Sequence, residues 1–361
     1  MRVIRIAGGE PEYDTPPHIV EAMKRALDGG ETHYGEFQHI SQLREAIAEK
    51  YRGYGVEADP GRVLVTPGST MAIYMVLKKL VGRGKEALVF DPCFFGYYDV
   101  AREAGVRLRR VRRRRGEWGF QVSDLYQATS EDTKALIVNS PDNPTGRVFS
   151  EEELRGIAEY SRETGVKVIS DDIYDRILYD GAQFRSLAAL PGMEGRVVVI
   201  NGLSKTYAMT GWRVGYIIAP SQEEYQALFE TQMSTYLVVN RALQYAALEA
   251  LTGPQDAVER MVEGYREKRG YVLDLWEDMP GVQVSKPQGA FYVFPDLSAY
   301  GLTSAQMAKY LREEAKVVLT PGHLFGEQGE GHLRNSFAQS MGDLEEGLSR
   351  VRKALAKLGP A

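Results

Sequence analysis

The amino-acid sequence predicts an α/β protein with a mostly parallel central sheet flanked by helices, followed by a smaller α+β domain. Short apolar runs alternate with longer helical patterns through the middle of the chain. Strands covered on both faces of a parallel sheet read as such runs. The pattern changes after about residue 250, and a chain of 361 residues is long enough for one large domain and a smaller one. We therefore assign residues 35–250 to the large domain, and residues 1–34 together with 251–361 to the small one.

The elements of the large domain follow in chain order. Strands are predicted at the apolar runs 63–65, 87–90, 135–138, 166–169 and 197–200. Helices are predicted at 70–80, near 97–104, and after Ser150, where Glu153 three residues later completes a capping box. In the small domain, helices are predicted at about 258–276, 304–314 and 342–358, and strands at 291–294 and 317–319.

Composition narrows the function classes. The net charge of −5 argues against a nucleic-acid binder. A single cysteine, Cys93, excludes a disulfide framework and a cysteine-rich metal site, and the five histidines show no pair at metal-ligand spacing. We therefore expect no metal site. The start of the chain has no apolar signal region and no apolar window reaches membrane-spanning length, so we expect a cytoplasmic protein that does not bind a membrane.

The arginine-rich run at 107–118 has two interpretations. It is either a patch for a nucleic acid or another acidic partner, or an edge strand whose charges discourage pairing with other chains. No aromatic residues interleave with the arginines and the chain is acidic overall, so the edge strand is favoured.

Polar and aromatic residues follow the predicted strands at their carboxyl ends, where open α/β sheets bind ligands. Ser69 and Thr70 open a helix after the first strand and either offer a hydroxyl and backbone N–H groups to a phosphate or act as ordinary helix caps. Phe94 follows the second strand and suits stacking on a flat ligand or packing in the core. Asn143 follows the third strand as an amide donor, in a segment that a plain turn would explain equally well.

The last two strand ends carry ionisable groups. Asp171 and Asp172 follow the strand 166–169, and Asp171 is preferred because it is nearer the strand, where an acid is costly unless paired or functional. Tyr174 comes one turn later. Lys205 follows the strand 197–200 among small and aromatic residues, with Arg213 as the next charge. Desolvation and this guanidinium lower the pKa of a lysine, as an amine nucleophile requires.

These segments resemble a known family. The matching stretches are GGEPEYDTP at 8–16, THY at 32–34, LREAIAEKY at 43–51, SPDNPTG at 140–146, SDDIY at 170–174, SKTYAMTGWRVGY at 204–216, PQGAFYVFP at 287–295 and HLRNSFA at 332–338. In this order they resemble the fold-type I pyridoxal 5'-phosphate (PLP) enzymes, and within them the class I/II aminotransferases of the aspartate aminotransferase type. The resemblance covers almost the whole chain.

The resemblance implies a role for each site residue toward the cofactor. Lys205 would bind PLP covalently and shuttle the proton, Asp171 would pair with the pyridine nitrogen, and Phe94 would stack on the ring. Tyr174 and Asn143 would hydrogen-bond the ring oxygen. The phosphate would be held by Ser69, Thr70 and Arg213, with Tyr34 reaching in from the second subunit of a homodimer.

The resemblance also implies how the substrate is held. Arg334 would grip the α-carboxylate in a bidentate fork, helped by Asn143 and the backbone N–H of Gly9. The implied reaction is ping-pong transamination between an L-amino acid, aspartate in the first place, and a 2-oxo acid, 2-oxoglutarate.

Two departures from the family pattern are visible. Many relatives have Ser or Thr as a phosphate ligand where this chain has Gly202, and the sequence does not tell whether Ser204 compensates. Relatives also have more residues before the GEP motif, and these form an arm that closes over the substrate. In this chain the contribution of that arm to side-chain recognition is expected to come from elsewhere or to be missing.

The side chain of the substrate stays open. Arg241 is a candidate for binding a distal carboxylate, with His33 and His39 as weaker ones. The apolar and aromatic neighbours at 236–238 would equally suit an aromatic or aliphatic side chain. A PLP-dependent lyase of C–S bonds would share the same lysine, acid and arginine. A transcription regulator would need a DNA-binding module, for which there is no room before residue 9.

Overall fold

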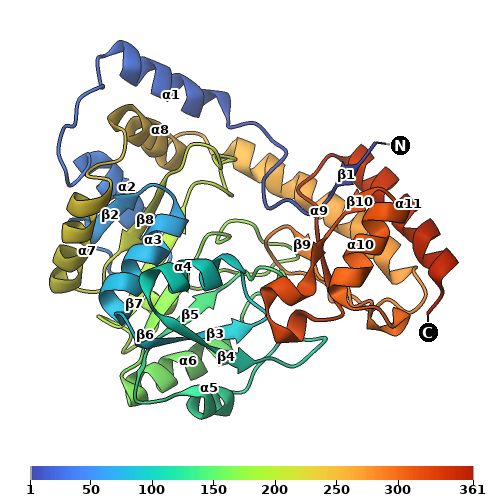
Figure 1. Ribbon diagram of the computed structural model, residues 1–361. Helices are drawn as coiled ribbons and strands as arrows, with labels where there is room; N and C mark the ends of the chain where they lie inside the picture. Colours follow the sequence, from blue (N-terminus) through green and yellow to red (C-terminus); the bar gives the residue numbers. More distant parts are fainter. Residues whose placement is uncertain (1, 361) are drawn as a thin grey trace.

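A seven-stranded sheet forms the centre of the computed structural model, which describes residues 2–360 (Figure 1). Its strands, in spatial order, are β2 (Val63–Thr66), β8 (Gly215–Ile218), β7 (Val197–Gly202), β6 (Lys167–Asp171), β5 (Thr133–Asn139), β3 (Glu86–Asp91) and β4 (Arg107–Arg112). Only β8 runs antiparallel to its neighbours. The carboxyl ends of the six other strands therefore lie at one edge, as the sequence predicted.

Helices cover both faces of this sheet. One face carries α3 (Ser69–Val76), α4 (Gly96–Ala104) and α7 (Gln222–Thr235), and the other carries α2 (Ser41–Arg52), α5 (Val122–Ala128) and α6 (Glu151–Thr164). Successive residues of a strand point to opposite faces. Accordingly Ala87 and Val89 lie in the core under α3, whereas Leu88 and Phe90 lie in the core on the opposite face. This double burial explains the continuous apolar runs.

Two helix predictions can be compared with the structure in detail. The capping box of α6 is present: the Ser150 hydroxyl accepts a hydrogen bond from the Glu153 N–H (3.2 Å), and the Glu153 carboxylate accepts one from the Ser150 N–H (2.9 Å). The helix predicted at 70–80 begins at Ser69 instead, and after Val76 it continues as a π-helical turn, Leu77–Val81.

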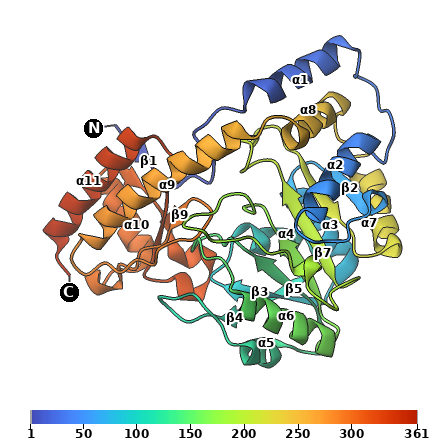
Figure 2. The same ribbon diagram turned by 180° about the vertical axis from the view of Figure 1, so that it is seen from behind.

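From residue 256 onward, the described chain contributes four strands to two small sheets and forms three long helices. The strands are β9 (Tyr292–Val293), β10 (Val317–Val318), β11 (Thr320–Pro321) and β12 (Leu333–Ser336), and the helices are α9 (Asp256–Glu277), α10 (Ser304–Glu314) and α11 (Met341–Leu358). The antiparallel order is β11–β12–β9. Figure 2 shows α9 running from the end of α8 (Arg241–Thr252) to the vicinity of α10 and α11, so this helix links the two parts of the molecule.

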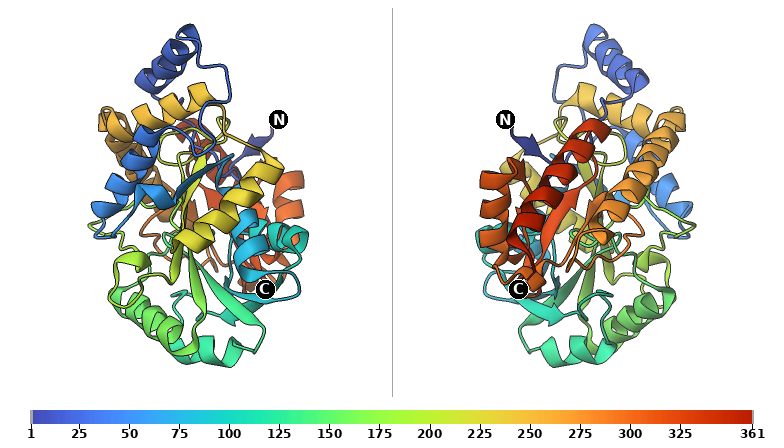
Figure 3. Two further views of the ribbon diagram at one scale, coloured as in Figure 1. Left: turned by 90° about the vertical axis from the view of Figure 1, so that its left-hand side faces the viewer. Right: turned by 90° about the vertical axis from the view of Figure 1, so that its right-hand side faces the viewer.

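The N-terminal segment contacts both parts. Strand β1 (Ile4–Arg5) pairs in parallel with β10 of the small part. Helix α1 (Pro17–Asp28) lies along α8 at one end of the molecule (Figures 1 and 3) and buries Ile19, Ala22 and Ala26. The domain limits inferred from the sequence therefore stay a prediction.

The arginine-rich run forms the edge strand β4. Arg107 and Arg109 pair with Glu86 on the neighbouring strand, and Arg107 also pairs with Asp132. The interpretation as a charged edge strand is thus confirmed.

Candidate active site

The strand-end residues converge on one cavity of about 200 Å³ at the carboxyl edge of the sheet. Ten of the eleven residues predicted for the site line it: Gly9, Ser69, Thr70, Phe94, Asn143, Asp171, Tyr174, Lys205, Arg213 and Arg334. They come from segments far apart in the sequence, and the fold brings them together.

Lys205 lies in the turn that leaves β7, and its Nζ donates a hydrogen bond to the carbonyl oxygen of Gly9 (2.5 Å). Burial is the main cause that lowers the pKa of its amine to about 8, and the positive charge of Arg334 comes next. Arg213, which the sequence suggested as the neighbouring charge, contributes less than Arg334. A lowered pKa leaves more of the amine uncharged at neutral pH, which a nucleophile requires.

Asp171 ends β6, and its carboxylate accepts a hydrogen bond from the Tyr97 hydroxyl (2.6 Å). Burial raises the pKa of this carboxyl to about 6, although the bond from Tyr97 lowers it. Asp172 belongs to a different network, because its carboxylate accepts hydrogen bonds from Tyr51 and Ser170. The structure thus places Asp171, and not Asp172, in the cavity.

The first turn of α3 and Arg213 form a pocket suited to an anion. Helix α3 begins at Ser69 and no side chain caps its N-terminus, so its first N–H groups are free to bind a negatively charged group. Gly68 before it has a φ of 81°, and a side chain there would collide with the Arg213 guanidinium. The left-handed backbone therefore favours glycine, and any larger residue would also displace the Arg213 guanidinium.

The surroundings of Gly202 are tightly packed, so a side chain there would press on its neighbours. A Cβ atom at this residue would lie 3.1 Å from the carbonyl oxygen of Val214 and 3.2 Å from a side-chain carbon of Ile173. Ser204, which we did not include in the predicted site, lines the cavity.

Phe94 forms an aromatic wall of the cavity. Its ring packs edge-on against Tyr97 (5.5 Å between centroids) and folds over Gly96, where any side chain would meet the ring. The absence of a side chain at Gly96 thus lets the Phe94 ring lie close to the start of α4.

Arg334 on β12 is buried and oriented from several sides. Its Nη1 donates to Oδ1 of Asn143 (2.9 Å) and its Nη2 donates to the carbonyl oxygen of Ala7 (2.8 Å). The guanidinium lies over the rings of Tyr292 (4.4 Å) and Phe325 (5.0 Å). Aromatic faces attract a guanidinium and hold its plane. The result is a fixed, planar fork of the kind that binds carboxylates.

Three residues that bond to the predicted site residues were not predicted from the sequence. Tyr97 bonds to Asp171, Tyr292 bonds through its hydroxyl to Tyr174 (2.9 Å), and Asn139 donates to the carbonyl oxygen of Asp171 (2.8 Å). Asn139 has the same signal as the residues that were found, because it is polar and ends the strand β5. Tyr97 and Tyr292 look like ordinary core aromatics in the sequence, and only the quoted stretch PQGAFYVFP contained Tyr292.

Tyr34 is the one predicted residue outside the cavity. Its side chain is 67% exposed, in the segment between α1 and α2. Tyr34 therefore contributes nothing to the site of its own chain. This is expected for a residue that acts in the site of a second subunit.

The candidates for a distal carboxylate also lie outside the cavity lining. Arg241 forms an ion pair with Glu31. His39 is buried, burial lowers the pKa of its imidazole to about 4, and its Nε2 accepts a hydrogen bond from the Val239 N–H (3.2 Å). His33 is exposed.

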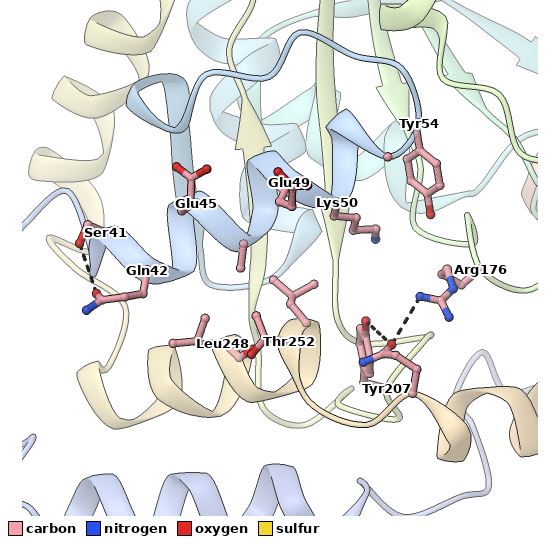
Figure 4. A pocket seen from close by; sticks show the side chains of 14 residues that line it. Ser41, Gln42, Glu45, Glu49, Lys50, Tyr54, Arg176, Tyr207, Leu248 and Thr252 are labelled. Atoms are coloured by element: carbon pink, nitrogen blue, oxygen red, sulfur yellow. Dashed lines mark hydrogen bonds between the residues drawn. The ribbon is translucent and has the colours of Figure 1, made fainter.

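A larger and more open cavity, of about 1110 Å³, lies beside α2 and the end of α8 (Figure 4). Gln255 accepts hydrogen bonds there from Tyr207 (3.1 Å) and Arg176 (3.4 Å), and the Lys50 amine pairs with Asp175 (2.6 Å). None of the predicted site residues lines it, so the chemistry is assigned to the smaller cavity.

The described part of the chain shows neither a metal-binding cluster nor a membrane-spanning helix. Among residues 2–360, no group of three His, Cys, Asp or Glu side chains could hold a metal ion. The helices of the same residues include none that is long and apolar enough to cross a membrane.

The donor set has a definite chemistry. An amine of lowered pKa can bind a carbonyl carbon covalently, and a buried carboxyl can pair with a ring nitrogen. The anion pocket lies at a helix N-terminus, and Phe94 offers a flat apolar wall. These residues fit a flat, phosphorylated carbonyl cofactor, and the guanidinium fork fits a carboxylate.

Comparison with known proteins identifies the family. The family model described as "Aminotransferase class I and II" matches residues 2–351. The chain belongs to the class I and II aminotransferases. Members of this family depend on PLP, so the chain is a PLP-dependent aminotransferase of fold type I, whose substrates are amino acids and keto acids.

Individual aminotransferases are similar over nearly the whole length. An aspartate aminotransferase of Pyrococcus abyssi is 40% identical over 98% of this chain and 92% of its own. An aromatic-amino-acid aminotransferase of Thermococcus litoralis is 38% identical over 98% of this chain and 92% of its own. The crystal structure of an aromatic aminotransferase from Pyrococcus horikoshii superposes with a TM-score of 0.96, at 39% identity, over 99% of this chain and 97% of the other.

Proposed function

We propose that this aminotransferase moves the amino group of an L-amino acid, aspartate in the first place, to 2-oxoglutarate by a ping-pong mechanism. The observation that carries the proposal is the meeting of Lys205, Asp171 and Arg334 in one cavity. Aspartate is favoured because relatives of this length and identity are named aspartate aminotransferases.

The chain's own residues would hold PLP at this edge of the sheet. Ser69, Thr70 and Arg213 would bind the phosphate at the start of α3, and Phe94 would cover the ring. Asp171 would hold a proton on the ring nitrogen, and Tyr174 with Asn143 would bind the ring oxygen. When bound, PLP supplies an electron sink for the charge that develops at the substrate Cα.

Lys205 would act twice. Its amine would hold the cofactor covalently in the resting enzyme, and once released it would take the proton from Cα and return it to the cofactor carbon. The nearby Gly9 carbonyl would hold the free amine, since Nζ bonds to that oxygen at 2.5 Å. The lowered pKa of Lys205 suits both tasks, because each needs the uncharged amine.

Arg334 would orient the substrate through its α-carboxylate. The Nε atom is buried and has no hydrogen-bond partner within residues 2–360, so the guanidinium keeps a free donor for a ligand. Asn143 and the Gly9 N–H would complete the carboxylate site. Fixing the carboxylate also fixes the direction of the Cα–H bond relative to Lys205.

Tyr34 would complete the site from a second subunit. Its exposure within one chain supports a homodimer in which each phosphate pocket receives the Tyr34 hydroxyl of the partner. A cytoplasmic location stays a prediction from the sequence.

An aromatic or aliphatic amino acid is the second candidate substrate. The positively charged side chains of the cavity lining are Lys205, Arg213 and Arg334, and each has a proposed role already. Arg241 is paired with Glu31, so it is not a free cation for a distal carboxylate within this chain. Relatives named aromatic aminotransferases support the same candidate.

A single-turnover screen tests the proposal. Purified enzyme loaded with PLP is mixed with one amino acid at a time, without an acceptor, and the 2-oxo acid formed is measured. One equivalent of oxaloacetate from aspartate, then turnover on adding 2-oxoglutarate, is the expected result. Product from tyrosine or leucine but not aspartate would select the second candidate. Continued release of pyruvate and ammonia without an acceptor would instead indicate a lyase.

A further inference from the structure

One turn of the small domain is docked on the end of the sheet strand β3. The turn is Phe325–Gln328, which joins the end of the short helix Gly322–Phe325 to the start of the short helix Glu327–Gly329. The two carboxylate oxygens of Asp91, the last residue of β3, accept hydrogen bonds from the backbone N–H groups of Glu327 (3.1 Å) and Gln328 (3.2 Å). Asp91 is 1% exposed, so these contacts are shielded from water.

Further contacts hold the same turn against the large domain. The Cys93 N–H donates to the carbonyl oxygen of Phe325 (2.9 Å). The side chain of Gln328 bonds twice to the backbone of Arg113, accepting from its N–H and donating to its carbonyl oxygen, each at 2.6 Å. At Gly326 a side chain would overlap the Asp91 carboxylate. The turn is therefore fixed by geometry as well as by hydrogen bonds.

The docked turn supports the carboxylate fork. The Phe325 ring is fully buried and lies 5.0 Å from the guanidinium of Arg334. Arg334 stands on β12, opposite Thr320 of β11, and the chain between these two strands contains the docked turn. A shift of the turn would move the Phe325 ring, one of the two faces between which the guanidinium is held.

We propose that Asp91 is a positioning residue for recognition of the substrate α-carboxylate. By holding Phe325–Gln328 it places the Phe325 ring, and through it Arg334, relative to Phe94, which is only three residues further along the chain from Asp91. The buried carboxylate of Asp91 thus fixes the position of the Arg334 guanidinium relative to the Phe94 ring. The inference rests on the proposed role of Arg334 in binding that carboxylate.

Two variants separate this role from a merely structural one. In Asp91→Asn, one acceptor oxygen is replaced by an NH₂ group that faces a backbone N–H donor, so one of the two bonds is lost. Gln328→Ala removes the clamp on Arg113 and leaves Asp91 intact. Loss of stability alone would lower the amount of active enzyme and the apparent kcat, whereas a misplaced fork raises the KM for amino acids.

The experiment measures kcat and KM with the substrate pair that the wild-type holoenzyme turns over fastest, and the Kd for PLP. We expect Asp91→Asn to raise KM about tenfold, with a smaller rise for Gln328→Ala, and with kcat and the PLP Kd each changed less than about threefold. Glu313→Gln on α10 is the matched control, because its exposed carboxylate lies outside both the turn and the cavity lining; its KM should stay at the wild-type value.

Arg334→Lys is measured in the same series to keep two failures apart. If Arg334→Lys leaves KM unchanged, the proposed role of Arg334 is wrong. If Arg334→Lys raises KM while Asp91→Asn and Gln328→Ala both leave it unchanged, Asp91 is not a positioning residue. Should Asp91→Asn not fold, the KM of Gln328→Ala decides whether the position of the docked turn controls substrate binding; an unchanged KM would overturn the proposal.

Discussion

Nη1 of Arg334 donates a hydrogen bond to Oδ1 of Asn143 over 2.9 Å, and this bond joins strand β12 to the turn that follows β5. Asn143 is itself fixed, because its N–H donates to the side-chain oxygen of Asn139 (3.0 Å). Asn139 in turn donates to the carbonyl oxygen of Asp171. A chain of hydrogen bonds therefore connects the proposed carboxylate fork with the proposed partner of the ring nitrogen.

Removing the amide of Asn143 should weaken substrate binding. Asn143→Ala leaves Nη1 of Arg334 without its acceptor in a buried place, so the guanidinium is free to rotate out of the fork geometry. We expect KM for the amino acid to rise about tenfold, equivalent to about 1.4 kcal/mol. Steady-state kinetics check this, with Gln42→Ala at an exposed position as the control. An unchanged KM would show that Arg334 holds its orientation without Asn143.

Replacing Lys205 should stabilise the cofactor-free protein at neutral pH. The pKa of its amine is about 8 in the fold, below the ordinary value of 10.5, so the native state binds fewer protons than the unfolded chain between these two values. The destabilisation is complete below pH 8 and disappears as the pH rises toward 10.5. Lys205→Met should therefore raise the free energy of unfolding by about 2 kcal/mol at pH 7.

Urea unfolding of the cofactor-free protein at pH 7 and pH 10 measures this difference. The gain from Lys205→Met should shrink at pH 10, and Lys309→Met on the surface of α10 should show no such dependence. An equal gain at both pH values would contradict a lowered pKa. The same Lys205 variant should have no measurable transamination, since no other amine lines the cavity among the described residues.

Tyr97 should set the lower pH limit of activity through Asp171. Its hydrogen bond lowers the pKa of the Asp171 carboxyl, which burial raises to about 6. Without that bond the pKa rises further, so the carboxylate is protonated at a higher pH. In Tyr97→Phe the acidic limb of the kcat/KM profile should move to higher pH. Tyr126→Phe, which removes a hydroxyl bonded to Glu163 at the surface, should leave the profile in place. If the acidic limb of the Tyr97→Phe profile stays at the wild-type pH, the group that titrates there is not Asp171.

Much of this site could be predicted from the sequence, because the meeting of residues at strand ends depends on topology alone. Once short apolar runs are assigned to parallel strands, their carboxyl ends must meet, and Asp171, Asn143 and Lys205 follow those ends. The reversed strand β8 was not foreseen, yet it brings Arg213 to the same edge because it starts there. The roles assigned to these residues came from the family resemblance.

The supporting residues could not be predicted, for a physical reason. Tyr97, Tyr292 and Phe325 are buried aromatics, and burial by itself selects such residues for any core. Their function lies in one hydroxyl or one ring face whose direction depends on tertiary packing. Asp91 is similar: its sequence position suggests a strand end, but its partners are backbone groups more than two hundred residues away.

Gly68 should be essential for cofactor affinity. In Gly68→Ala the new methyl group would collide with the Arg213 guanidinium and the φ of 81° would be strained, so the anion pocket should open. We expect the Kd for PLP to rise at least about tenfold. Gly82→Ala is a matched control, because its φ is 92° but its added methyl group meets nothing within 4 Å. It should lose stability of about 1 kcal/mol without a change in PLP affinity.

Mixing two variants should reveal that Tyr34 acts across a subunit interface. Tyr34→Ala removes the exposed phenol from both sites of the proposed homodimer, and the Kd for PLP should rise about tenfold because one hydrogen bond to the phosphate is lost. Lys205→Ala dimers keep the phenol but cannot bind PLP covalently. In a mixed dimer, one site combines Lys205 of the first chain with Tyr34 of the second and is intact. Refolding the two variants together should therefore restore tight binding and activity to one site per mixed dimer, whereas each variant alone stays defective. If the mixture shows only the average of the two parents, Tyr34 does not act in the partner's site.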